Sequence, residues 1–149
     1  MTSKNLWASS TFFLGMVASA GCMGCQSHEG DEEQLKEYAD SFATLYFNWH
    51  FEQAAHYATP SSEPWLRFAS SNVGQADVDS LRSKEADAMV TLDDITYADD
   101  TTATITLHVT DFLEMDTIGK APLHKDKATF QLPMQIHEGK WKVALSKLP

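Results

Sequence analysis

The spacing of the apolar side chains changes once along this chain, and that change is the strongest constraint on its fold. Between residues 31 and 84 the apolar residues recur every three or four positions, which is the period of an amphipathic α-helix. From residue 88 onward they alternate with polar residues, which is the period of a β-strand with one buried face. This order predicts an α+β domain in which N-terminal helices pack on a curved, bulged antiparallel sheet of about four strands.

The first part of the domain is expected to be helical. The first helix should begin near Asp31, where three consecutive acidic residues suit the positive end of the helix dipole. Its apolar stripe consists of Leu35, Tyr38, Ala39, Phe42, Leu45, Tyr46 and Trp49. A short second helix is expected over residues 52–58, and Thr59-Pro60 should end it, because the residue before a proline disfavours helical geometry.

A third helix is expected to begin at Ser62. Ser62 is the expected N-cap, since a serine side chain can accept a hydrogen bond from the first turn, and Pro64 suits that turn because no N–H is needed there. The ring of Trp65 should then pack in the core with Phe42 and Tyr46. The sheet face above these rings is expected to consist of Ile105, Leu107, Phe130, Trp141 and Val143.

The first strand is expected to contain a β-bulge. Its apolar positions change from even to odd numbers between Leu92 and Ile95, so either Asp93 or Asp94 must be accommodated without alternating. A bulge can turn one carboxylate toward the concave face, but the simpler expectation is that both face solvent at a bend of the sheet. The connections between strands are expected at residues 99–101, 116–127 and 138–139.

The first 21 residues differ in composition from the rest of the chain. Lys4 is their only charged side chain, and a largely apolar run over residues 6–20 leads to Cys22. This pattern is typical of a secretory signal peptide, whereas a membrane-spanning helix needs about 20 mostly apolar residues and this run is interrupted by serines and a threonine. We therefore expect residues 1–21 to be a cleaved signal peptide and the protein to be exported.

The chain has two cysteines, Cys22 and Cys25, and both follow the apolar run. One such pair lacks the second pair of a zinc site and the strand-helix setting of a redox loop. The small residues before Cys22 resemble the box of bacterial lipoproteins, although Ser19 stands where leucine is usual. The resemblance implies acylation of Cys22, with Cys25 as the alternative, and anchoring of the protein in a bacterial membrane, with the outer membrane favoured.

The protein is acidic, with a formal net charge of −10. Residues 22–30 are expected to be a lipidated acidic tether, and residues 31–149 a single domain. Residues 117–149 differ, since they hold six lysines and two acids. Lysines that alternate along strands usually face solvent, and an anionic-ligand patch is the alternative. We expect no nucleic-acid partner, because phosphate contacts need clustered Lys and Arg and most of this chain is acidic.

Two segments carry a family resemblance: NWHFEQAAHYATP at residues 48–60 and EGKWKV at residues 138–143. With helices first and a bulged sheet after them, the chain resembles the nuclear transport factor two-like fold, also called the ketosteroid isomerase-like or cystatin-like cone, as it occurs in small exported lipoproteins. Trp49-His50 stand where such families often have Gly-Asp. The resemblance implies a cone that can enclose an apolar pocket, and it carries over no catalytic residue.

The candidate site residues lie near this expected pocket and at the end of the second strand. They are Tyr46, His50, Tyr57, Asp94, Asp111, Glu114 and Asp116. The last three alternate with apolar residues beside the longest connection, where a binding rim is favoured. The histidines lack metal-ligand spacing and the acids lack the oxygen series of a calcium loop, so we expect neither a metal nor another cofactor.

Two classes of function follow from these residues. The leading hypothesis is a non-enzymatic envelope module that binds a small ligand or a protein partner through the cone mouth and the loop over residues 111–127. The alternative is a small enzyme of isomerase, dehydratase or hydrolase type that uses an acid or a histidine inside the cone. An enzyme would need a buried ionisable side chain in the pocket, and this requirement separates the two classes.

Overall fold

The computed structural model describes residues 29–149, so the predicted signal peptide, Cys22 and most of the predicted tether lie outside the described residues. The helices are α1 (Glu29–Phe47), α2 (Phe51–Ala54), α3 (Glu63–Ser71) and α4 (Gln75–Ser83), with 3-10 turns at Ala55–Tyr57 and Pro60–Ser62. The strands are β1 (Met89–Tyr97), β2 (Thr102–Glu114), β3 (Leu123–His137) and β4 (Lys140–Val143). The predicted α+β class is confirmed, and α1 includes the last two residues of the predicted tether.

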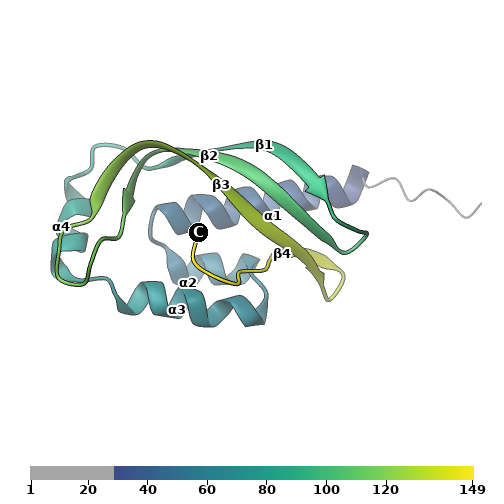
Figure 1. The fold of residues 1–149 in the computed structure, drawn as a ribbon, viewed down its shortest axis with the longest axis horizontal. Helices are drawn as coiled ribbons and strands as arrows, with labels where there is room; N and C mark the ends of the chain where they lie inside the picture. The colour runs from purple at the N-terminus through teal and green to yellow at the C-terminus, as the bar shows by residue number, and fades with distance from the viewer. Residues whose placement is uncertain (1–28) are drawn as a thin grey trace, which may run out of the picture.

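The four strands form one antiparallel sheet in the order β1-β2-β3-β4. The sheet arches over α1, and α2 and α3 lie beyond that helix (Figure 1). The register between β1 and β2 shifts between Leu92 and Ile95, which confirms the predicted bulge. Asp93 and Asp94 are both exposed, so the bulge bends the sheet without bringing a carboxylate into the interior.

The core lies between α1 and the concave face of the sheet. Leu35, Ala39 and Phe42 of α1 are completely buried. Ile105, Leu107 and Val109 are buried on β2, and Trp141 and Val143 are buried on β4. The predicted alternation of β2, with its odd-numbered residues inward, is therefore confirmed over the first part of that strand.

The prediction that Trp65 packs under the sheet is wrong. Leu66 and Ala69 are the buried residues of α3, whereas Trp65 and Phe68 are 37% and 55% exposed. α3 packs mainly on α2 and not on the sheet, so it buries only one narrow stripe. Trp65 and Phe68 each precede a buried residue by one position, and successive side chains of an α-helix point about 100° apart. Both aromatic rings therefore lie at the surface.

Ser62 stands immediately before α3, but its side chain makes no capping bond to that helix. The completely buried hydroxyl donates to the carbonyl oxygen of Val143 at 3.1 Å and accepts from the N–H of Leu145 at 2.8 Å. The hydroxyl of Thr59 lies 2.8 Å from the Ser62 hydroxyl oxygen. Ser62 therefore ties the start of α3 to the end of β4, which corrects its predicted role as a side-chain N-cap.

β3 is longer than the spacing of apolar residues predicts. It begins at Leu123, so the connection after β2 spans residues 115–122 and not 116–127. The residues at 124–127 are all charged or polar and give no alternating signal. Pairing with β2 extends the strand instead, for example between Phe112 and Lys125.

Two side-chain amides complete the hydrogen bonding at outer edges of the sheet. Gln34 of α1 accepts from the N–H of Trp141 at 2.8 Å and donates to its carbonyl oxygen at 3.2 Å. Asn48 makes the same pair of bonds, at 2.8 Å and 3.2 Å, with Ala88 just before β1. The backbone N–H and carbonyl of Trp141 and of Ala88 point away from the sheet. Each side-chain amide bonds both of these groups, as the backbone of a neighbouring strand would do.

Candidate functional site

An apolar pocket of about 190 Å³ opens where the end of α1 meets the end of β2, and we call it the mouth pocket. Its aromatic wall consists of Tyr46, Phe47, Trp49, Phe51, Phe112 and Phe130. Its other lining residues are Leu113, Glu114, Met115, Leu148 and Pro149. Apolar cavities of about 150 Å³ hold a benzene molecule, so the mouth pocket has room for one ring or one branched side chain.

The aromatic wall is held together by ring contacts between α1, β2 and β3. Phe47 lies 5.4 Å from Phe112 and 4.6 Å from Phe130, and the last two rings lie 5.6 Å apart. Asp111 helps to place Phe112, because its left-handed backbone (φ 53°) interrupts the alternation of β2. Phe112 and Leu113 are consequently both buried, although they are neighbours in a strand.

Trp49 occupies a backbone conformation that favours glycine. Its φ is 64° in the turn that ends α1, where its N–H donates to the carbonyl oxygen of Tyr46 at 3.0 Å. A residue with a side chain costs about 1 to 3 kcal/mol in this region. The indole N–H donates to the carbonyl oxygen of Leu113 at 3.2 Å, which fixes the ring in the pocket wall. The position thus retains a large aromatic ring at the pocket despite an unfavourable backbone.

Tyr46 is the partly buried ionisable residue of the mouth pocket. Burial raises the pKa of its phenol to about 12, so the group is neutral at physiological pH. A neutral phenol can donate one hydrogen bond, but a pKa so far from the working pH makes it a poor general acid or base. Tyr46 therefore suits the recognition of a ligand better than proton transfer.

Glu114 is the carboxylate at the rim of the mouth pocket. Its side chain is half exposed and lies 3.1 Å from the ammonium of Lys125 on the neighbouring strand. Among the residues that line the pocket in the described structure, none is a histidine and none is a buried carboxylate.

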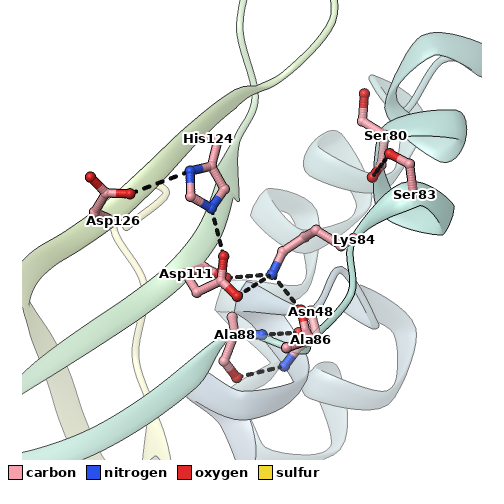
Figure 2. A network of polar contacts seen from close by, with 9 residues as sticks. All are labelled: Asn48, Ser80, Ser83, Lys84, Ala86, Ala88, Asp111, His124 and Asp126. Carbon is pink, nitrogen blue, oxygen red and sulfur yellow. Dashed lines mark hydrogen bonds and ion pairs between the residues drawn. The ribbon is translucent and has the colours of Figure 1, made fainter.

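A second group of polar side chains lies where the linker after α4 meets β2 and β3 (Figure 2). The ammonium of Lys84, whose side chain is only 14% exposed, lies 3.4 Å from the Asp111 carboxylate and donates to the carbonyl oxygens of Asp111 and Ala86. His124 hydrogen-bonds the other oxygen of Asp111 and approaches Asp126 at 3.6 Å. The His124 bond, followed by the Lys84 charge, lowers the pKa of Asp111. This network fastens the linker to the sheet.

The other predicted site residues lie away from the mouth pocket. His50 is exposed beside a shallow hollow on α2, and Tyr57 packs edge-on against Tyr38 with ring centroids 5.2 Å apart. Asp94 lies on the exposed bulge. Asp116 bonds the N–H of Thr117 within its own turn, and this bond lowers the pKa of Asp116. The structure thus brings Tyr46 and Glu114 together at one pocket, and it separates the remaining candidates from them.

Several residues of the mouth pocket were not among the sequence candidates. Trp49 and Phe112 form much of the wall, and Met115 forms part of the rim. The doublet Phe112-Leu113 was an available signal, because two adjacent apolar residues break the alternation of the strand. Lys84 and His124 gave no such signal, since their partner Asp111 is distant in sequence.

No group of three or more His, Cys, Asp and Glu side chains within residues 29–149 is arranged to hold a metal ion. None of the described helices combines the length and the hydropathy needed to cross a membrane.

Comparison with known proteins gave similarities of backbone only. No family model and no curated protein matches the chain. An NTF-2 like protein of unknown function from Shewanella oneidensis MR-1 is 13% identical with a TM-score of 0.49, over 75% of this chain and 93% of that one. A putative NTF2-like transpeptidase from Campylobacter jejuni is 14% identical with a TM-score of 0.47, over 74% of this chain and 97% of that one. Neither assigns a residue or an activity to this chain.

Proposed function

We propose that this protein is a binding module of the bacterial envelope, and that its mouth pocket takes up one apolar group of a small ligand or of a protein partner. The observation that carries the proposal is Trp49, which keeps a bulky ring in the pocket wall at a backbone position suited to glycine. Unfavourable backbone conformations persist only where the surrounding structure holds them, and they cluster at binding and active sites. The proposal of a binding module over an enzyme is supported by the neutral phenol of Tyr46 and the solvated, paired Glu114.

The pocket can be tested with fluorobenzene, a neutral ring of suitable size, observed by fluorine NMR. We expect saturable binding to the native protein and at least tenfold weaker binding to Met115→Trp, because the larger side chain would occupy the rim of the pocket. Ile118→Trp is the matched control, since Ile118 is 78% exposed on the connection after β2 and should leave binding unchanged. Equal binding by both variants, or none by the native protein, would disprove the proposed pocket.

A second variant in the same experiment separates the pocket wall from the stability of the fold. Trp49→Gly removes the ring but relieves about 1 to 3 kcal/mol of backbone strain, which offsets part of the lost packing. We expect fluorobenzene binding to weaken at least tenfold while the unfolding midpoint changes little. A variant that binds as well as the native protein would show that the ring is not needed for recognition.

We also propose that Cys22 is acylated and anchors the protein in the membrane. The proposal is supported by the signal-like run over residues 1–21 and by the small residues before Cys22. Mass spectrometry of the N-terminal peptide from the native host should show an acylated Cys22. In the Cys22→Ser variant the protein should leave the membrane fraction, whereas Cys25→Ser should stay in it. The reverse result would assign the lipid to Cys25.

A further inference from the structure

One edge of β3 has backbone groups without a partner. β4 pairs only with residues 134–137, whereas β3 begins at Leu123. The N–H of Ile136 donates to the carbonyl oxygen of Thr101, the residue just before β2, and the carbonyl oxygen of Pro133 accepts from the N–H of Ala144 on the opposite side. In an antiparallel strand the backbone groups of alternate residues point to opposite sides, so the odd-numbered residues point away from β2. We call this run the free edge, and it consists of Lys125, Lys127, Thr129 and Gln131.

The free edge differs from the other edges of the sheet. Gln34 and Asn48 supply amides at β4 and at the start of β1, and the buried Ser62 accepts from the N–H after β4. The outer side of β1 is interrupted by its bulge, which carries two exposed aspartates that oppose pairing with another strand. Within residues 29–149 no backbone or side-chain group bonds the outward backbone N–H and carbonyl groups of the free edge. The free edge is thus the continuous run that remains open to an added strand.

A groove connects the free edge to the mouth pocket. It has a volume of about 390 Å³ and lies between β3 and the segment over residues 145–149. Thr129 and Gln131 line one side of it, and Lys147 lines the other. Phe130 and Leu148 line both the groove and the mouth pocket. A strand about 4.8 Å from β3 would therefore direct alternate side chains toward the pocket and toward the outer surface.

The charges along the free edge favour an acidic partner. Lys125 and Lys127 extend from its odd-numbered positions, and Lys147 lies across the groove. Lys125 already pairs with Glu114, but Lys127 has no ion pair among the described residues. Residues 117–149 carry six lysines and two acids in a chain of net charge −10. A second copy would bring the same net charge and the same lysines to the interface, which opposes self-association.

We propose that the free edge accepts an extended acidic segment of a partner protein as an added β-strand, with one apolar side chain of that segment in the mouth pocket. Backbone hydrogen bonds to the four residues of the edge supply affinity, and the pocket and the lysines supply specificity. The proposal rests on the proposed function, because it names the occupant of the same pocket.

The probe is the blocked peptide Ac-Glu-Val-Glu-Phe-Glu-Val-Glu-NH2, which presents apolar side chains on one face and carboxylates on the other. We expect it to bind the native protein saturably and to slow amide hydrogen exchange at Lys127, Thr129 and Gln131 at least tenfold. The same peptide with lysine in place of every glutamate should bind at least tenfold more weakly. The N-methylated copy, in which the backbone N–H groups of the pairing edge are methylated, should also bind at least tenfold more weakly. If the N-methylated copy binds equally well, the added strand is disproved.

Two variants at one position test the edge on the protein side. Thr129→Pro removes an outward N–H but no backbone bond to β2, so proline is tolerated there better than in a central strand. The bond between the Thr129 hydroxyl and His108 of β2 is lost in both Thr129→Pro and Thr129→Val, so the comparison of the two variants isolates the N–H. Peptide affinity should fall at least tenfold, whereas Thr129→Val, which keeps the N–H, should bind normally. The N-methylated peptide acts on the native protein, so the test stands even if Thr129→Pro folds poorly.

Fluorobenzene distinguishes failure of this inference from failure of the proposed function. Fluorobenzene binding without peptide binding would overturn the added strand and leave the pocket in place. If neither fluorobenzene nor the peptide binds, the mouth pocket and the added strand are both overturned. Dimerisation of the native protein in light scattering, abolished by Thr129→Pro, would show that a second copy occupies the edge and would overturn the partner segment. Met115→Trp should weaken both probes, whereas Thr129→Pro should weaken only the peptide.

Discussion

Replacing Trp141 with alanine is expected to lower the free energy of unfolding by about 3 to 5 kcal/mol. Trp141 is 2% exposed at the centre of the core, where its ring lies 6.0 Å from that of Tyr97. The truncation would leave a cavity that the surrounding sheet and α1 cannot fully close. A domain of this size has only about 5 to 15 kcal/mol of stability, so the shift in a denaturation midpoint should be large.

Two control variants make this prediction specific. Trp65→Ala removes the same side chain from the exposed face of α3 and should cost less than about 1 kcal/mol. Trp141→Phe keeps most of the packing and removes an indole N–H that is buried with no hydrogen bond to a described residue, so it should cost much less than the alanine variant. Equal losses in Trp141→Ala and Trp65→Ala would show that the buried sheet face is assigned incorrectly.

Replacing Ser62 with alanine should cost about 1 to 3 kcal/mol, a large effect for the loss of one oxygen atom. The variant would leave the N–H of Leu145 buried without its acceptor, and the carbonyl oxygen of Val143 would keep only its bond from Thr59. Because the hydroxyl joins the start of α3 to the end of β4, hydrogen exchange should accelerate most in the chain after β4.

The matched control for this second variant is Ser70→Ala. Ser70 lies on the exposed face of α3 and makes no side-chain hydrogen bond to a described residue, so its loss should change stability by less than about 0.5 kcal/mol. Urea denaturation of the two variants measures the difference directly. If Ser62→Ala is as stable as Ser70→Ala, then the buried hydroxyl does not hold α3 to the sheet.

The two halves of the candidate site have different physical origins. The mouth pocket depends on side chains that meet only in the folded chain, since Trp49 bonds Leu113 across the domain. The free edge depends on a difference in length, because β3 continues past the point where β4 ends. A partner that uses the mouth pocket and the free edge would combine an apolar anchor with backbone pairing. A single substitution can remove the pocket or the edge and leave the other in place.

The sequence by itself determined the elements and the positions of most core residues. Apolar periods of 3.6 and 2 distinguish helix from strand, because side chains on one face of each element recur at that spacing. The change of parity between Leu92 and Ile95 located the bulge for the same reason. Tyr46 and Glu114, which line the mouth pocket, were candidates from the sequence because the broad stripe of α1 and the end of β2 are local features.

Only the tertiary structure decided which apolar residues remain exposed and where the pocket forms. Trp65 is exposed because α3 packs mainly on α2 and not on the sheet, and the sequence of a helix does not show which elements will cover it. Ser62 bonds the end of β4, and Asp111 turns the chain so that Phe112 lines the pocket. The free edge exists because β4 ends early beside β3, a property of two strands together. The spacing of apolar residues describes each helix or strand separately. Side-chain packing and strand pairing depend on segments that are distant in sequence and meet only in the folded chain.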